Sequence, residues 1–382
     1  MKFPRVLFIQ PLLPSYSIDF FNEMKSQAPE LELTVAADLK SKSALNQLDQ
    51  RELQFKAVNL EFSRVGPFQW IKGLRALVDS PDFDIVVFNG NPRDLSQLLA
   101  MAFLRMRRRT FFVWGMFHKI GRQKWHTRFY YQLVAKLASK LLTYSRTGAR
   151  NLASLGVPER KISVIGTAID QRRVRKHAEL VSERDKARFL EEQGLVGKKI
   201  VLQVVRLSAI KKPGFLIDAA REILRDRDDV VFVLIGDGEM REELEAKVKS
   251  YGLSDGVRFM GAIYDEAVLA RWYLTSTVFV MPTCIGLSAH HSMAYGLPVV
   301  TDDSVESQAS EFDIVYHMLN GIVYKNSSLT SLAKSLEKVV DDSALQRSLS
   351  KGALVTVTNN SSIERKANNF LLNFGLDMER TE

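Results

Sequence analysis

Short apolar runs alternate with longer amphipathic stretches along the whole chain. Most of the short runs are continuously apolar, which is typical of strands buried on both faces of a parallel sheet. The strands predicted in the first half are Val6–Gln10, Leu31–Ala36, Ile85–Asn89, Thr110–Trp114, Lys140–Tyr144 and Ile162–Ile165. Those predicted in the second half are Ile200–Val205, Val230–Ile235, Val257–Met260, Val278–Met281, Pro298–Thr301 and Ile322–Tyr324.

Helical patterns fill the stretches between these strands. The predicted helices are Leu95–Leu104, Phe215–Asp226, Met240–Tyr251 and Ser361–Leu376. Alternation of strand and helix predicts a doubly wound α/β architecture. It occurs twice in 382 residues, so we expect two Rossmann-like domains, over residues 1–170 and 171–360. Residues 171–197 are highly charged and are expected to form the connection and an entry helix.

The composition is that of an ordinary globular protein, with 46% hydrophobic and 25% charged residues. Cys284 is the one cysteine, which excludes an intramolecular disulfide and favours a reducing compartment. The apolar run Val6–Ile9 is too short for a signal-peptide core, and no run reaches the roughly 18 residues of a membrane-spanning helix. We therefore expect a cytoplasmic protein, soluble or peripheral to the membrane.

The net charge of +9 is unevenly placed, because residues 101–150 hold twelve Lys or Arg and no Asp or Glu. Aromatic residues lie among these cations, a mixture that favours an anionic membrane surface or a phosphorylated substrate. A solvated basic face is the alternative. Nucleic acid is not expected as a partner, since no nucleic-acid motif accompanies the charge. The cations expected to face the membrane are Arg105, Arg107, Arg108, Arg109, Lys119, Arg122 and Lys124.

Arg206 and Lys211 follow a strongly predicted strand and precede a helix. In open α/β sheets, ligands bind beyond the carboxyl ends of the strands. Two cations there would hold a diphosphate and stabilise it as a leaving group. A solvated basic loop is the alternative.

The segment 281–300 reads as a strand, a glycine-containing turn, a short helix and a second strand. Backbone amides at Gly286, Leu287 and Ser288 would point outward at the helix start, where anions or polar oxygens bind. His291 shares a helix face with Leu287, whereas His290 points elsewhere. One histidine of the pair is expected to be structural, and the pattern leaves open which.

Two loops of the first half are expected to face a cleft between the domains. The first contains Pro14 and Tyr16 after the first strand, and the second contains His118. We expect these residues to line a substrate site, with His118 as a catalytic candidate and a structural histidine as the alternative.

Two other motifs do not indicate a functional site. The turn Ile235–Glu239 lacks the full glycine fingerprint of a dinucleotide site, and Asp302-Asp303 is interpreted as a solvated pair rather than a metal site. No Ser/His/Asp spacing, Walker loop or Cys/His zinc pattern supports a hydrolase, a kinase or a zinc enzyme.

Several short sequence motifs, in this order, resemble those of a known family. They are Arg206-Leu207-x-x-x-Lys211, Ile235-Gly236-Asp237-Gly238, Phe259-x-Gly261, Met281-Pro282 and Gly296-x-Pro298-Val299-Val300. Across residues 199–340 they look like the C-terminal domain of family-4 retaining glycosyltransferases of the GT-B fold. The first half also contains four motifs that are similar to motifs of that family. They are Phe20-Phe21, Trp114-Gly115, Thr143-Tyr144-Ser145 and Ile165–Asp170.

The resemblance implies two Rossmann-like domains whose parallel sheets face each other across a cleft. It implies a nucleotide-sugar donor on residues 171–360, an acceptor on residues 1–170, and a C-terminal segment, 361–382, that crosses back to the first domain. Arg206 and Lys211 would grip the donor phosphates, so that no metal or other cofactor is needed, and the anomeric configuration would be retained. The expected enzyme transfers a sugar to a lipid-linked saccharide or polysaccharide in bacterial surface polysaccharide synthesis, such as lipopolysaccharide or capsule. It would work at the cytoplasmic face of the inner membrane.

One departure from the family concerns two glutamates that it usually has eight positions apart. Thr283 and His291 occupy those positions here. Thr283 would then contact the transferred sugar and His291 the ribose, both through hydrogen bonds. The histidine before Ser292, with Glu311-Phe312, also resembles a divergent bacterial branch. The departure leaves two alternatives open, a non-catalytic nucleotide- or glycan-binding partner of an active transferase and a nucleotide-sugar epimerase of the same fold.

Overall fold

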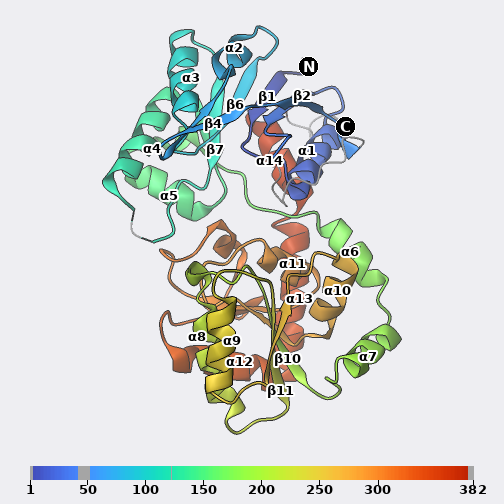
Figure 1. Cartoon of the computed structure of the whole chain (residues 1–382). Helices are drawn as coiled ribbons and strands as arrows, with labels where there is room; N and C mark the ends of the chain where they lie inside the picture. Colours follow the sequence, from blue (N-terminus) through green and yellow to red (C-terminus); the bar gives the residue numbers. More distant parts are fainter. Residues whose placement is uncertain (1–2, 42–51, 122, 377–382) are drawn as a thin grey trace. The chain divides into compact units, whose positions relative to one another are not determined.

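The computed structural model describes residues 3–41, 52–121 and 123–376. The chain divides into two compact units (Figure 1). Unit 1 is Met1–Ile169 together with Ile363–Glu382, and unit 2 is Asp170–Ser362. The chain therefore passes from one unit to the other twice, within a residue or two of the limits expected from the sequence.

Unit 1 contains a seven-stranded parallel sheet with the strand order β3-β2-β1-β6-β7-β8-β9. The strands are β1 Arg5–Ile9, β2 Glu32–Ala37, β3 Lys56–Asn59, β6 Ile85–Asn89, β7 Phe111–Gly115, β8 Lys140–Thr143 and β9 Ile162–Val164. All six predicted strands are confirmed. The sequence prediction missed β3 and the antiparallel hairpin of β4 Phe62–Val65 and β5 Phe68–Ile71, because their four-residue runs mix polar and apolar side chains.

Helices cover both faces of this sheet (Figure 1). One face carries α1 Ser15–Gln27 and α14 Ile363–Asn373, and the other carries α2 Leu74–Asp79, α3 Leu95–Met106, α4 Trp125–Leu137 and α5 Arg146–Ser154. In β1, Val6 and Phe8 pack in the first of these cores, and Leu7 and Ile9 pack in the second. Burial on both faces explains why the strand is continuously apolar.

The last helix, α14, belongs to the core of unit 1 although it comes from the far end of the chain. The ring of Phe370 lies 5.6 Å from that of Phe8, 5.1 Å from Phe20 and 5.2 Å from Trp114. Aromatic rings at these separations pack favourably beyond their buried area. The predicted helix Ser361–Leu376 thus forms over a shorter range and completes the core of the first unit.

Unit 2 contains a six-stranded parallel sheet with the order β12-β11-β10-β13-β14-β15. The strands are β10 Lys199–Val204, β11 Val230–Ile235, β12 Val257–Gly261, β13 Val278–Val280, β14 Val299–Asp302 and β15 Gly321–Tyr324, and all were predicted. Helices α8 Pro213–Leu224, α9 Arg241–Ser250 and α12 Leu329–Asp341 pack on one face. The remaining helices are α6 Gln171–Glu179, α7 Glu183–Glu192, α10 Glu266–Thr275, α11 Ser288–Ala294 and α13 Ser343–Asn359.

Residues 171–197 form two helices, α6 and α7, rather than the single entry helix expected. A capping box closes the start of α7, where Ser182 and Asp185 bond each other's backbone amides. This local signal separates the two helices and was missed.

The strand order of unit 2 reverses beside β10, because β11 lies on one side of it and β13 on the other. In a doubly wound sheet such a switch point opens a crevice between the two loops that leave the carboxyl ends of the neighbouring strands. Here these are the loop after β10, which carries Arg206 and Lys211, and the loop after β13, which carries residues 283–287. The fold alone therefore predicts a ligand site where the sequence placed its candidates.

Candidate functional site

Lys211 joins the two loops at the switch point of unit 2. Its Nζ donates to the carbonyl oxygen of Cys284, and a Cβ added at Gly286 would lie 3.6 Å from that Nζ. The lysine ends the short 3₁₀ helix Ala209–Lys211, and Pro213 begins α8 two residues later. The predicted donor-site residues Lys211 and Gly286 are thus neighbours, although 75 positions separate them in the sequence.

Arg206 lies on the same edge of the sheet and is largely in solvent, with 78% of its side chain exposed. Its guanidinium lies 3.3 Å from the carboxylate of Glu239, in the loop after β11. Exposed ion pairs of this kind contribute roughly 0–1 kcal/mol, so the guanidinium is available to a phosphate at little cost. Arg206 and Lys211 thus lie at the same carboxyl edge of the unit 2 sheet, where they form a cationic rim.

The turn after β11 shapes the loop that carries Arg206. Gly236 has φ 139°, and a Cβ there would lie 1.8 Å from the carbonyl oxygen of Val205. At Gly238 a Cβ would lie 2.3 Å from the carbonyl oxygen of Leu207. Only glycine allows the two backbones to approach this closely. The structure thus gives this turn a role in supporting the Arg206 loop.

Thr283 lies below the surface of the loop, with 1% of its surface exposed. Its hydroxyl lies 2.9 Å from that of Ser307, and Gln308 links the loop to β14 by donating to Asp302 over 2.7 Å and accepting from the amide of Ile285 over 2.8 Å. This network therefore buries the Thr283 hydroxyl, which was expected to contact the transferred sugar, and leaves it no open face for that contact.

Asp302 is also buried, which corrects the interpretation of Asp302-Asp303 as a solvated pair. Burial raises the pKa of the Asp302 carboxyl, although hydrogen bonds from Thr283 and Gln308 act in the opposite direction. Asp303 does lie at the surface, where its carboxylate accepts from the amide of Asn326.

The structure separates the roles of the two adjacent histidines. His290 is fully buried, and its Nε2 lies 2.8 Å from the hydroxyl of Ser361. His291 retains 30% exposure of its side chain. His290 is therefore the structural histidine, and His291 is the one that reaches the surface.

His291 has an acidic neighbour that sequence reasoning missed. Its Nε2 lies 3.5 Å from a carboxylate oxygen of Glu266, the first residue of α10, and the hydroxyl of Tyr295 donates to the other oxygen over 2.7 Å. Burial by itself would raise the pKa of Glu266, but the hydrogen bonds and charge of His291 and the hydroxyl of Tyr295 hold it below its ordinary value. In the sequence, an acidic residue directly after Asp265 indicates the stabilised start of a helix. This signal predicted a structural role for Glu266 and gave no indication of a functional site.

The acceptor candidates lie in unit 1, after β1 and β7. Pro14 is buried at the start of α1, Tyr16 is exposed one residue into that helix, and His118 is 7% exposed with its Nδ1 3.1 Å from the carbonyl oxygen of Met116. Strand β6 separates β1 from β7 in the sheet. The expected cleft between the domains stays a prediction.

Residues 101–131 contain fewer surface aromatics than the pattern indicated. Trp125 is 79% exposed and Phe129 is 61% exposed, both on α4. The aromatic side chains of this segment that pack in the core are Phe111, Phe112, Trp114, Phe117, Tyr130 and Tyr131. The exposed expected cations are Arg105, Arg107, Arg108, Lys119 and Lys124, whereas Arg122 lies outside the described residues.

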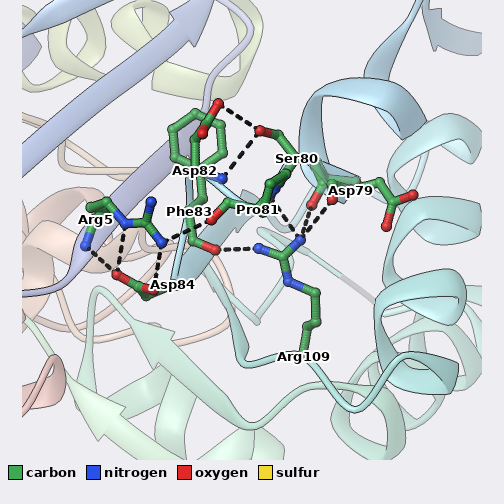
Figure 2. Close-up of polar contacts among 9 residues, drawn as sticks. Arg5, Asp79, Ser80, Pro81, Asp82, Phe83, Asp84 and Arg109 are labelled. Carbon is green, nitrogen blue, oxygen red and sulfur yellow. Dashed lines mark hydrogen bonds and ion pairs between the residues drawn. The ribbon is translucent and has the colours of Figure 1, made fainter.

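Arg109 is a structural residue, which corrects its assignment to the membrane-facing set. Figure 2 shows its guanidinium turned toward the loop that joins α2 to β6. It donates to the carbonyl oxygens of Val78, Asp79, Ser80 and Phe83, and beside it Arg5 pairs with Asp84 at 3.0 Å. A guanidinium with several backbone acceptors is held in place rather than offered to a partner.

Two searches of the described residues were negative. Residues 3–41, 52–121 and 123–376 contain no group of three or more His, Cys, Asp or Glu placed to hold a metal ion. In the same ranges, no helix combines the length and apolarity needed to cross a membrane.

The two parallel sheets and the cationic rim at a switch point define an α/β protein with a candidate anion site in unit 2. Comparison with known families makes this class specific. The chain belongs to the glycosyl transferases group 1, whose family model matches residues 158–355, more than half of the chain. A second model, Glycosyltransferase Family 4, matches residues 28–173.

Individual proteins agree with this assignment. An uncharacterised glycosyltransferase of Methanocaldococcus jannaschii is 29% identical over 208 residues, which cover 53% of this chain and 51% of the relative. The match therefore spans about half the length of that curated relative.

Solved structures match over nearly the whole chain. Anabaena Alr3699/HepE, crystallised with UDP, has a TM-score of 0.76 at 16% identity and covers 97% of this chain and 99% of its own. A putative UDP-N-acetylglucosamine 2-epimerase of Listeria monocytogenes has a TM-score of 0.66 at 15% identity and covers 100% and 98%. At these identities the likeness shows the fold alone, which is the GT-B fold predicted from the sequence.

Proposed function

We propose that this protein is a glycosyltransferase that moves a sugar from a nucleotide-sugar donor to a lipid-linked saccharide or polysaccharide acceptor in bacterial surface polysaccharide synthesis. The observation that carries the proposal is the family match over residues 158–355, which contains Arg206, Lys211 and the loop from Thr283 to His291. The UDP bound to the Anabaena structure supports a nucleoside diphosphate as the donor's leaving group.

The cationic rim supplies the charge that such a reaction needs. When the bond between the sugar and the diphosphate breaks, negative charge builds on the departing phosphate oxygens. Arg206 and Lys211 stabilise that charge. The carbonyl of Cys284 holds Lys211 in position before the reaction, whereas Arg206 is only weakly paired with Glu239 and can turn to the phosphate. We propose that the reaction requires no metal and retains the anomeric configuration, as the resemblance to family-4 enzymes implies.

The loop at the start of α11 would orient the donor. The amides of the first turn of a helix have no acceptor within that helix, so Gly286, Leu287 and Ser288 offer donors beside Lys211. His291, on the same short helix, adds a polar ring at the surface. Positioning of this kind contributes to rate by holding the reacting atoms in place.

The acceptor is proposed to bind unit 1 near Pro14, Tyr16 and His118. These residues follow β1 and β7 at the carboxyl edge of the sheet, where ligands of doubly wound sheets bind. His118 would have to act through the small part of its ring that reaches the surface, which suits hydrogen bonding to an acceptor hydroxyl.

We further propose that a surface of unit 1, the α3–α4 surface, holds the enzyme at the cytoplasmic face of an anionic membrane. The exposed apolar residues of this surface are Leu99, Met106, Trp125 and Phe129, and its exposed cations are Arg105, Arg107, Arg108, Lys124 and Arg128. The two helices are in contact and lie side by side in Figure 1. Exposed aromatic side chains at the start of α4, together with cations at the end of α3 and the start of α4, suit the headgroup region of anionic lipids.

A donor panel tests the transferase. UDP-, GDP- and dTDP-sugars are incubated with the protein, with and without a bacterial membrane extract, and each incubation is repeated with EDTA. We expect nucleotide release with one donor only when the extract is present, and unchanged by EDTA.

Two other outcomes would replace the proposal. Conversion of a nucleotide sugar without extract would indicate an epimerase, the candidate that the Listeria likeness favours. Nucleotide binding without turnover of any donor would indicate a non-catalytic partner of an active transferase, the candidate favoured by the buried Thr283.

A further inference from the structure

Four side chains, two from α10 and two at α11, connect these helices. Glu266 and Tyr273 lie two turns apart on α10, and His291 and Tyr295 lie one turn apart at α11. Glu266 accepts from Tyr295 over 2.7 Å and lies 3.5 Å from His291. The ring of Tyr273 stacks on that of His291 at 6.3 Å and 13°, and on that of Tyr295 at 5.1 Å and 10°.

Glu266 belongs to the same rim as the phosphate-binding candidates. It follows β12 by five residues, and β12, β11, β10 and β13 are consecutive parallel strands whose carboxyl ends share one edge of the sheet. The titratable groups that face its carboxylate are His291 and Tyr295 from α11, Tyr273 from its own helix and His177 from α6. An ionised carboxylate therefore lies beside the one histidine of the pair that reaches the surface.

We propose that Glu266 is a positioning residue for the donor, which orients the imidazole of His291 so that the pair binds the ribose hydroxyls of a nucleoside diphosphate. This inference rests on the proposed function. In the family, a carboxylate at the position of His291 would make that contact directly. Here the carboxylate comes from the neighbouring helix and acts through the imidazole.

The geometry explains how Glu266 would act. A histidine nitrogen that faces a carboxylate keeps its proton, which fixes the tautomer and leaves the opposite ring nitrogen for a ligand. The stack on Tyr273 limits tilting of the ring, but not rotation within its plane. Glu266 restricts that rotation. Without Glu266, the second ring nitrogen of His291 would no longer be held in one orientation.

A pair of ligands that differ only at the ribose isolates this contact. Binding of UDP, GDP and ADP to the full chain is measured by calorimetry, and the tightest is compared with its 2′,3′-dideoxy analogue. For Glu266→Gln we expect about tenfold weaker binding of the ribonucleotide, the usual cost of a hydrogen bond to a charged group, and little change for the dideoxy analogue. Glu266→Asp, which keeps the charge but shortens the side chain, should fall between the two proteins.

A compensating variant makes the test more specific. His291→Glu alone would place two carboxylates together and weaken binding of the ribonucleotide. The double variant Glu266→Gln/His291→Glu leaves one carboxylate at the family's position, and we expect it to recover ribose-dependent binding. Glu242→Gln, an exposed first-turn carboxylate on α9, is the matched control and should bind both ligands as the unmodified protein does.

Two results would overturn the inference in distinguishable ways. Equal loss of affinity for both ligands in Glu266→Gln and Glu266→Asp would make Glu266 a structural residue and leave the proposed function standing. Failure of the unmodified protein to bind any of the three nucleotides would overturn the proposed function and this inference with it.

Discussion

At the scale of single residues, the candidate site depends on a few side chains with different surroundings. Lys211 is tied to the backbone of Cys284, whereas Arg206 is exposed and loosely paired. The backbone contact holds Lys211 in place, whereas the exposed ion pair leaves the Arg206 side chain able to change partner. Substitutions at these residues and at the glycines that support them should therefore have separable effects.

Lys211→Ala tests the assigned contact with the phosphates. Loss of a cation that stabilises a leaving group should lower kcat/KM about 100-fold or more, measured as nucleotide release with the active donor. Lys212→Asn is the matched control, because Lys212 is the adjacent exposed lysine and its φ of 47° suits asparagine. Near-normal turnover of Lys211→Ala would remove this residue from the site.

Gly236→Ala tests the close approach of the β11 turn to the Arg206 loop. The added Cβ would collide with the carbonyl oxygen of Val205, at a φ of 139°. We expect the free energy of unfolding in urea to fall by about 2 kcal/mol or more.

Gly252→Ala is the control for this change, because its φ of 68° is also positive and nothing lies within 4 Å of the new Cβ. It should cost about 1 kcal/mol. Equal losses for the two variants would mean that backbone conformation, rather than the contact with Val205, limits position 236.

At the scale of elements, continuous apolar runs predicted twelve strands and the structure contains all of them. The strands β3, β4 and β5 were missed because they are short and partly exposed at the side of unit 1. Helix α4 was also missed, since its buried aromatic residues and its exposed ones were read together as one surface patch. The structure divides that patch into a core face and the α3–α4 surface.

The α3–α4 surface is tested by Arg107→Gln/Arg108→Gln with sedimented vesicles of 30% phosphatidylglycerol. Each cation near an anionic membrane contributes about 1 kcal/mol, so binding should weaken roughly tenfold to thirtyfold at low salt. The difference should shrink as salt rises, because exposed charges are screened.

Lys334→Gln/Lys351→Gln is the control for charge, because it removes two exposed cations from unit 2. It should bind vesicles as the unmodified protein does. If both double variants bound equally well, the basic segment would be a solvated face, the alternative that the sequence left open.

At the scale of the whole molecule, the chain leaves unit 1 after Ile169 and returns at Ile363. The returning helix α14 and the residue that follows it place Phe370 and Phe374 among the aromatic rings of β1, α1 and β7. The stability of unit 1 therefore depends on residues that follow unit 2 in the sequence.

Phe370→Ala should destabilise unit 1 selectively. The side chain is fully buried, and removal of a core phenylalanine costs about 3–5 kcal/mol. Denaturation followed by hydrogen exchange should show earlier unfolding of unit 1, with unit 2 protected as before.

Leu372→Ala lies on the same helix with its side chain exposed, and should change stability by about 0.5 kcal/mol or less. Equal destabilisation of both units by Phe370→Ala would show that they unfold as one cooperative body.

The sequence by itself determined the two α/β halves, their strands, and the cations and glycine turns that follow the strands. These features could be predicted because apolar periodicity and the spacing of Arg206, Lys211 and Gly286 are visible in the linear sequence. It also separated His290 from His291 by helix face, without assigning their roles.

Only the tertiary structure decided which of these side chains meet. It buried Thr283 against Ser307, turned Arg109 toward backbone carbonyls, made His290 structural and set Glu266 beside His291. Each of these outcomes depends on a contact between segments that are distant in sequence. The packing of helices on a sheet creates such contacts, and no local pattern encodes them.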